Sequence, residues 1–582
     1  MSRKLINDPE HLIAELIEGM LSAHPDRLTT QGTTGRAIVA RHGPRPGKVG
    51  IVVGGGSGHE PAFAGYVGKG LADAAPLGNI FASPSPPQIL DAGFAADGGA
   101  GVLFLFGNYT GDVMNFSMAE EAMVKQGVTA RSFVTTDDIA SAPPDHAHER
   151  RGIAGNFFVF KVAGAAADLG APLHAVEAAA RRANAATRTM GVALSACSMP
   201  QTGKANFDIP EGEMEIGMGI HGEPGIARIP AETADAVTDR LLGPIIEELG
   251  LVAGDTVAVL VNGLGSTTLL ELYLLHRRVA AVLADRQVGI HHSWVGEYCT
   301  SLEMGGASVS LMKLDDDLQR WLDHPCDTPA LQVGATSAPV ATPAPAATRP
   351  VARTAPSSNP AVPRAELATS GPVTPAVFRH MMAASAQAIF DARDRLCELD
   401  GAIGDGDHGI TMEIGWKAAV AALDDAAPDA TIAQLSDTIA AAFLDAVGAS
   451  AGPLYATGFR TAGAAVSDRL NLDSAALVAW LRGIGDGIAA RGGAAIGDKT
   501  MLDAWLPAID AATAALARGG DVAACLAAAA EGAAAGAGDT TGMQSRRGRS
   551  KKLGARSVGH QDPGAASSAI ILAAWSGAVR DL

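Results

Sequence analysis

Residues 48–61, KVGIVVGGGSGHEP, join a short apolar run to a glycine-rich turn, and this combination decides the fold of the first half of the chain. Similar β-branched or aromatic runs occur at residues 101–106, 128–134 and 256–261. Short runs of this kind are typical of buried parallel strands in an α/β fold. Ligands of such sheets bind beyond the carboxyl ends of the strands, which is where the glycine turn lies.

The second half of the chain has a different pattern, dominated by Ala and Leu. Helical periodicity is clear at residues 431–447, 474–491, 501–516 and 522–538, and no run indicates a strand. We therefore predict an all-helical bundle at residues 372–582. Residues 331–371 are rich in Pro, Ala, Thr and Ser, which favours an extended linker. Residues 1–330 form the α/β module, divided into subdomains at about 1–190 and 191–330.

Bulk composition excludes several classes of protein. The formal net charge of −18 over 582 residues argues against nucleic-acid binding, which needs a basic face. The five cysteines are scattered without metal-binding spacing, which suits a reduced cytoplasm. No apolar run reaches the roughly 18 residues of a membrane span, and the N-terminus lacks the apolar core of a signal peptide. We expect a cytoplasmic protein without nucleic-acid or membrane partners.

Residues 399–412, LDGAIGDGDHGITM, contain the densest group of acids in the chain: Asp400, Asp405 and Asp407. Carboxylates this close repel one another unless cations lie between them, and oxygen-only ligands suit Mg²⁺, which keeps part of its shell for phosphate. An EF-hand is excluded because the glutamate that closes such a loop is missing. The alternative is a solvated acidic turn.

Three polar motifs lie in the first half. His59 ends the glycine turn, which lacks the GK[ST] of a P-loop. Asp112 ends NYTGD and could act as a general base or cap a helix. His221 lies within GMGIHGEPG; no strand pattern precedes it, so a dinucleotide fingerprint is disfavoured. An imidazole on such a turn could add to a carbonyl or relay a proton, although a lone histidine is often structural.

The helical half adds GASAGPLY, GDKTMLD, RRGRSKK and GHQDPGA at residues 448–455, 497–503, 546–552 and 559–565. Small residues permit close approach to a nucleotide, and the basic run could offset phosphate charge or be a solvated loop. Together with VNGLGSTTLLEL (261–272) and TSLEMGG (300–306), these motifs resemble the dihydroxyacetone kinases over nearly the whole chain outside the linker. Fusion of both modules resembles the single-chain, ATP-dependent branch of that family.

The resemblance implies a kinase that phosphorylates the terminal hydroxyl of a short ketose, working as a homodimer with ATP and two Mg²⁺ ions. His221 would bond to the carbonyl carbon as a hemiaminal, while His59 and Asp112 handle the hydroxyl proton. Asp400, Asp405 and Asp407 would hold the metal. The implied substrate contacts are Gly56, Ser57, Gly58, His59, Gly107 and Asp112; the implied nucleotide contacts are His408, Gly409, Ile410, Thr411, Ala449, Ser450, Arg549, Asp562, Pro563 and Gly564.

Two departures from the family pattern concern the substrate. Phe63 stands where the family usually has His, and Gly107 where it usually has Lys. The loss of both polar groups predicts a larger pocket, so the substrate is either dihydroxyacetone or a larger ketose such as erythrulose. Two other functions remain open: a nucleotidyl cyclase or lyase acting on FAD-type ribonucleotides, and a non-catalytic ketone sensor.

Overall fold

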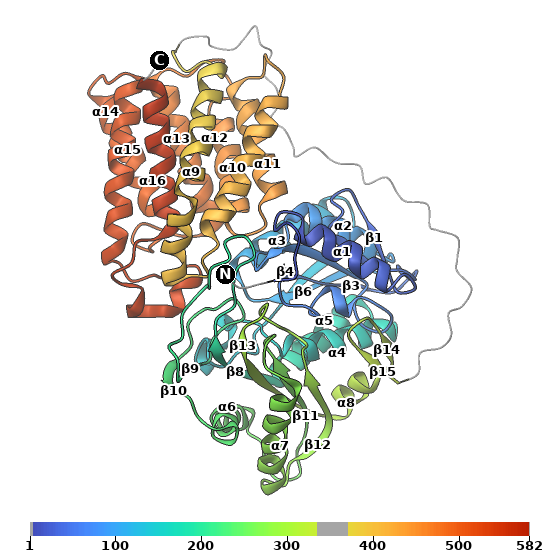
Figure 1. Ribbon diagram of the computed structural model, residues 1–582. Helices are drawn as coiled ribbons and strands as arrows, with labels where there is room; N and C mark the ends of the chain where they lie inside the picture. The colour runs from blue at the N-terminus through green and yellow to red at the C-terminus, as the bar shows by residue number, and fades with distance from the viewer. Residues whose placement is uncertain (1–3, 335–370, 581–582) are drawn as a thin grey trace. The chain divides into compact units, whose positions relative to one another are not determined.

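The computed structural model describes residues 4–334 and 371–580, apart from the side chains of Arg549 and Lys552. The chain forms two compact units, Met1–Val351 and Ala352–Leu582 (Figure 1). Most of the predicted linker lies outside the described residues. Its first residues do not, because Gln332–Val333 form strand β15, which pairs with β14 (Cys326–Asp327) in the first unit. The predicted domain boundaries remain predictions.

The first unit contains two large sheets. The first has the strand order β1-β2-β5-β3-β6-β7, with β4 paired to β5. Its central pairs β3–β5, β3–β6 and β6–β7 are parallel, as the apolar runs predict. The strands are β1 (Leu28–Gln31), β2 (Ala37–Ala40), β3 (Gly50–Val53), β4 (Gly55–Ser57), β5 (Ala74–Ile80), β6 (Val102–Gly107) and β7 (Ala130–Thr135).

The second sheet has the order β10-β9-β8-β13-β11-β12 and is mostly antiparallel. Its strands are β8 (Thr187–Ser195), β9 (Glu213–Ile216), β10 (Ala227–Pro230), β11 (Thr256–Gly263), β12 (Gly289–Gly296) and β13 (Gly305–Lys313). The apolar run at 256–261 is a buried strand as predicted, but β11 is parallel only to β12 and antiparallel to β13. An apolar run reports burial on both faces and carries no information on strand direction.

Helices separate and cover the two sheets, giving layers in the order helix, sheet, helix, sheet, helix (Figure 1). Helices α2 (Pro86–Ala96) and α3 (Thr110–Lys125) cover the first sheet, and α6 (Ala234–Leu249) and α7 (Leu269–Asp285) cover the second. The middle layer holds α4 (Asn156–Asp168) and α5 (Leu173–Ala185), bordered by α1 (Leu12–Ala23) and α8 (Asp316–Asp323). Helix α4 is almost wholly buried because both sheets enclose it.

The second unit is a closed ring of helices and confirms the predicted bundle. Each helix packs on the next, and the last packs on the first, around a core that includes Trp416, Trp480, Trp505 and Trp575. The helices are α9 (Pro375–Ile403), α10 (His408–Asp425), α11 (Ile432–Ala446), α12 (Ala451–Ala465), α13 (Ser474–Gly492), α14 (Leu502–Ala517), α15 (Val522–Asp539) and α16 (Pro563–Arg580). Consecutive helices run in opposite directions, so the loops after α9, α11, α13 and α15 share one end (Figure 1).

Candidate functional site

Two histidines from different parts of the first unit meet in its interior. His59 follows β4, and His221 lies in the loop after β9, yet their Nε2 atoms are 3.0 Å apart. Both side chains are buried, at 1% and 5% exposure. The structure therefore brings together the two imidazoles that the sequence singled out.

The partners of the other ring nitrogens define the protons of this pair. His59 Nδ1 lies 2.8 Å from the carbonyl oxygen of Thr300, and His221 Nδ1 lies 3.0 Å from Oε1 of Glu223. Both partners only accept hydrogen bonds, so each Nδ1 carries a proton. In the neutral form of each ring, Nε2 therefore carries a lone pair and no proton. A hydrogen bond between the two Nε2 atoms then needs one extra proton, whose charge the Glu223 carboxylate can balance. Once that proton leaves, His221 Nε2 is free to act as a nucleophile.

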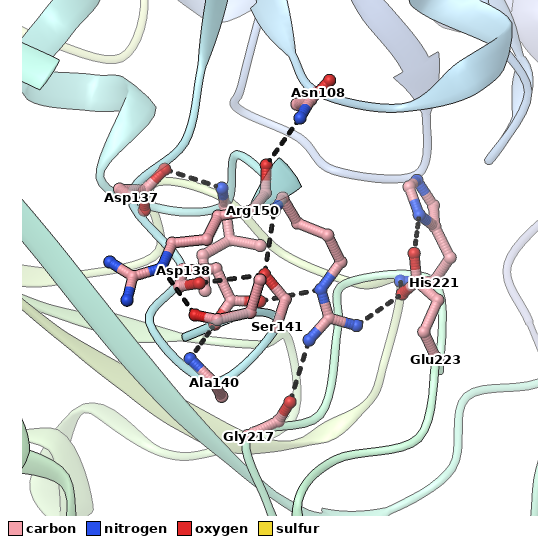
Figure 2. Close-up of polar contacts among 12 residues, drawn as sticks. Asn108, Asp137, Asp138, Ala140, Ser141, Arg150, Gly217, His221 and Glu223 are labelled. Carbon is pink, nitrogen blue, oxygen red and sulfur yellow. Dashed lines mark hydrogen bonds and ion pairs between the residues drawn. The ribbon is translucent and has the colours of Figure 1, made fainter. Parts of the chain in front are cut away.

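A buried ion network fixes Glu223. Arg151 donates from Nε to Asp138 (2.7 Å) and from Nη2 to the carbonyl of Gly217 (2.9 Å), and its Nη1 lies 3.8 Å from Glu223. Figure 2 shows the Glu223 carboxylate directed at the His221 ring, and its Oε2 also accepts the backbone N–H of His221. Burial disfavours the Arg151 cation, but Asp138 and Glu223 outweigh that effect and raise its pKa. Glu223 is thus held between a permanent cation and the imidazole that it orients.

Aromatic rings enclose the histidine pair and exclude water from it. Phe81 stacks on His59 at 5.0 Å, and Tyr109 meets His221 edge-on at 4.7 Å between ring centroids. Burial, with the neighbouring His221, lowers the pKa of His59 to about 3. His59 is therefore neutral at ordinary pH and presents Nε2 as a proton acceptor.

Gly107 and Asp112 lie at the two ends of the short connection from β6 to α3. Asp112 is buried in the first turn of α3, where Tyr109 is the N-cap, so the capping alternative for Asp112 is wrong. Gly107 ends β6, and a Cβ built there would lie 2.8 Å from the Tyr109 ring. The predicted vacant space at residue 107 is therefore wrong, because Tyr109 fills it. The rings of Phe63 and His59 meet edge to face, with 6.4 Å between their centroids.

The glycine turn is held by internal hydrogen bonds. The Ser57 hydroxyl donates to the carbonyl of Gly78 (2.8 Å), and the N–H of Gly58 donates to the Glu60 carboxylate. A Cβ at Gly56 would lie 2.7 Å from the backbone of Ala82, so glycine is needed for this close approach. These contacts make the turn rigid, and the substrate roles of its residues remain predictions.

In the second unit, the predicted metal cluster assembles at the end of α9. Ligand oxygens of Asp400, Asp405 and Asp407 all lie within 4.8 Å of one another, and all three side chains are buried. Asp400 also accepts the N–H groups of Asp407 (3.0 Å) and His408 (3.3 Å), which fixes the turn. Burial and then the Asp400 charge raise the pKa of Asp407 well above its usual value. A buried, oxygen-only donor set under mutual repulsion fits Mg²⁺.

Other predicted nucleotide contacts surround this cluster. His408 Nε2 lies 2.9 Å from the Ser567 hydroxyl, and Asp562 caps α16 by accepting the N–H of Ala565 (2.7 Å). Burial, then Asp400 and Asp503, raise the pKa of Asp562 to about 7. The cluster and the turn before α16 are therefore close enough to interact electrostatically.

The remaining predicted contacts share the same end of the ring. Ala449 and Ser450 precede α12, while Pro563 and Gly564 begin α16. Gly409, Ile410 and Thr411 form the first turn of α10; a Cβ at Gly409 would lie 2.0 Å from the carbonyl oxygen of Arg393, so this glycine permits the packing of α10 on α9. Arg549 begins the 3₁₀ segment Arg549–Ser557, and its side chain is outside those described.

Sequence reasoning missed four residues that shape these sites. Glu223 lies two positions after His221 inside a quoted motif, and a histidine followed by a buried acid could have indicated it. Tyr109 lies inside the quoted NYTGD motif, but its ring partner His221 is distant in sequence. Arg151 gave no signal because its partners Asp138 and Glu223 belong to other segments. Lys499 is buried and donates to the carbonyls of Met543, Ser557 and His560, which holds the loop between α15 and α16.

Comparisons with known proteins agree with these two units. The chain matches the Dak1 domain at residues 18–330 and the DAK2 domain at residues 402–577. The D-erythrulose kinase of Mycolicibacterium smegmatis is 39% identical over 572 residues, 97% of each chain. The dihydroxyacetone-binding subunit DhaK of the PTS-dependent dihydroxyacetone kinase 2 of Listeria innocua is 48% identical over 331 residues, 57% of this chain and 99% of that one.

A solved structure matches over both units. The dihydroxyacetone kinase from C. freundii in complex with AMP-PNP and Mg²⁺ has a TM-score of 0.52 and 29% identity, covering 99% of this chain and 100% of that one. Among the helices that the structure describes in this chain, none is both long and apolar enough to span a membrane.

Proposed function

The chain belongs to the dihydroxyacetone kinase family with both domains fused, and on this premise we propose that it transfers the γ-phosphate of ATP to the terminal hydroxyl of a short ketose. The observation that carries the proposal is the buried His59–His221 contact with Glu223 on the far nitrogen of His221. A ketone suits such a nucleophile because its carbonyl carbon carries no leaving group, so the imidazole can add to it and remain bonded. Neither a sensor nor a cyclase explains this nucleophile together with the buried aspartate cluster.

The first step is addition to the ketone. The lone pair of His221 Nε2 attacks the carbonyl carbon, and the proton held between the two histidines moves to the carbonyl oxygen. The product is a hemiaminal with an imidazolium ring whose charge faces Glu223. The substrate is now fixed at one carbon, so its terminal hydroxyl is presented in one place.

The second step is phosphoryl transfer. His59 Nε2, neutral because of its lowered pKa, or the Asp112 carboxylate accepts the hydroxyl proton as the oxygen attacks the γ-phosphorus, and ADP leaves. We propose that Asp400, Asp405 and Asp407 hold two Mg²⁺ ions, which offset the phosphate charge. His408–Thr411, Ala449–Ser450, Arg549 and Asp562–Gly564 are proposed to contact the nucleotide.

Erythrulose is the proposed preferred ketose over dihydroxyacetone. The support is the full-length similarity to a D-erythrulose kinase, together with Phe63, which removes a polar group beside His59. The similarity of the first unit to a dihydroxyacetone-binding subunit makes dihydroxyacetone the competing substrate. Tyr109, which covers Gly107, is then the side chain that sets the size of the pocket.

A coupled assay of ADP release tests both levels of the proposal. The substrates are dihydroxyacetone, both enantiomers of erythrulose, glyceraldehyde and glycerol. We expect turnover of ketoses, the highest kcat/KM with one erythrulose, and none with glycerol, which has no carbonyl. Equal turnover of glycerol would contradict the covalent step. A preference for dihydroxyacetone of about tenfold or more would contradict only the choice of ketose.

We also propose that the protein is a homodimer. The first two turns of α7 expose a group of apolar side chains, Leu269, Leu270, Tyr273 and Leu274, and contiguous exposed apolar surface is typical of protein interfaces. Light scattering of the wild type and of Leu270→Asp tests this: a dimer that the substitution dissociates is expected, and a wild-type monomer would contradict it.

A further inference from the structure

A second group of metal-ligand side chains lies outside both sites described above. The Nε2 atoms of His291 and His292 lie 2.8 Å and 2.9 Å from Oδ1 of Asp323. The histidines belong to β12, the edge strand of the second sheet, and Asp323 is the last residue of α8. Three ligand atoms from two elements thus converge at one point.

A β-bulge makes this convergence possible. Successive residues of a regular strand point to opposite faces, so adjacent histidines should diverge. In the β11–β12 pair, Val257 is opposite Ile290 but Ala258 is opposite His292, which leaves His291 as an extra residue. The bulge turns both imidazoles to the same side, with ring centroids 4.6 Å apart. Bulges often redirect a side chain for a specific use.

The neighbour of His291 can support metal binding. The side-chain amide of Gln319 lies 3.1 Å from His291 Nδ1. When Nε2 binds a metal, the proton of the ring moves to Nδ1, and rotation of the amide by half a turn presents its oxygen to accept that proton. Metal-bound histidines usually have such a partner on the other nitrogen.

We propose that His291, His292 and Asp323 bind Zn²⁺. Two imidazoles and one carboxylate suit zinc, whereas the all-oxygen aspartate cluster of the second unit suits Mg²⁺. His292 and Asp323 are 40% and 44% exposed, so water can complete the coordination. The ion would tie the edge strand β12 to α8 and stabilise this side of the first unit.

The test measures zinc bound to the full-length protein after treatment with a chelator and dialysis into excess Mg²⁺, which keeps the aspartate cluster filled. Titration calorimetry with Zn²⁺ and visible absorption with Co²⁺ report the site without reference to kinase activity. We expect His291→Gln with His292→Gln to lose one bound Zn²⁺ per chain, and Asp323→Asn, which keeps a hydrogen-bond acceptor, to lose it as well. Gln319→Ala should weaken binding about tenfold.

His276 supplies a matched control. It is another partly exposed histidine, on α7. Its Nε2 lies 2.8 Å from the hydroxyl of Ser293, which belongs to β12 like His291 and His292. His276→Gln should leave the zinc stoichiometry and the Co²⁺ spectrum unchanged. Thermal melting with chelator present identifies any variant that fails to fold. Equal zinc binding by wild type, the double variant and Asp323→Asn would overturn the proposal.

Discussion

The two sites bury charge in opposite ways. In the first unit, Arg151 lies between Asp138 and Glu223, so each of these three buried charges has an opposite charge close by. In the second unit, three carboxylates converge within 4.8 Å, and the pKa of Asp562 nearby is raised to about 7. The first site is therefore prepared by folding alone, whereas the second becomes favourable only with cations. The proposed function requires this difference, because the first site would hold a neutral ketone and the second would hold Mg-ATP.

The largest effect is expected from His221→Ala, which removes the nucleophile from a site that otherwise stays intact. The expected loss in kcat/KM for ketoses is about 10³-fold or more. Mg-ATP binding, measured by calorimetry, should not change, because the proposed nucleotide contacts lie in the other unit. Ketose turnover by His221→Ala within about tenfold of wild type would contradict the covalent role proposed for His221.

Asp405→Asn with Asp407→Asn should abolish productive Mg-ATP binding and lower kcat by about 10²–10³-fold. The apo-protein should become more stable, because two buried like charges are removed. Thermal melting with and without Mg-ATP measures both effects. If Mg-ATP raised the melting temperature of the double variant as much as that of wild type, the metal would have to bind elsewhere.

Glu223→Gln should lower kcat/KM by about 10²-fold and change its pH profile, since the amide cannot balance an imidazolium. In the proposed mechanism Glu223 acts through His221, so it is a positioning residue. Asp138→Asn is the companion variant: it keeps the shape of the network but weakens the hold on Arg151, and a smaller effect is expected. A pH profile that is unchanged in Glu223→Gln would contradict the role given to its charge.

The pH dependence of stability should differ between the units. The pKa of His59 is about 3 in the folded state and 6.5 when unfolded. Between pH 3 and pH 6.5, His59 is therefore protonated in the unfolded chain and neutral in the folded chain. The contribution of His59 to the stability of the first unit should fall by roughly 3–5 kcal/mol as pH falls from 6.5 to 3. The pKa of Asp562 is about 7 in the folded state against an ordinary 3.8, so Asp562 is protonated in the folded chain and ionised in the unfolded chain between these pH values. The contribution of Asp562 to the stability of the metal-free second unit is therefore lost as pH rises from 3.8 to 7.

Thiol labelling can follow both units in one chain. Cys299 is buried in the first unit and Cys525 in the second, and both are free. Samples equilibrated in urea at each pH receive a brief labelling pulse at one fixed pH, and mass spectrometry assigns the modified cysteine. His59→Asn should reduce the pH dependence of labelling at Cys299, and added Mg²⁺ should reduce the pH dependence of labelling at Cys525. If labelling of Cys299 and Cys525 changed with pH in the same direction, the predicted difference between the two units would be wrong.

The fold was largely predictable from local pattern, and the sites only in part. Apolar runs located β3, β6, β7 and β11, and periodicity located the helices of the second unit, because burial imposes these patterns locally. The aspartate cluster was found because its three members lie within eight residues of one another in the sequence. The contact of His59 with His221, the ring of Tyr109 against His221 and the role of Arg151 depend on packing between distant segments. The bulge at His291 likewise leaves no mark in the sequence.

In the proposed mechanism, folding alone prepares His221 to bond to a ketone. ¹³C NMR of a ketose labelled at its carbonyl carbon reports this bond. With wild-type protein and no nucleotide, the account predicts that the bound resonance moves from the carbonyl region to that of a tetrahedral carbon. Glu223→Gln should show a smaller bound fraction, and His221→Ala should show none. A bound ketose that keeps its carbonyl resonance in an active wild-type enzyme would contradict the account.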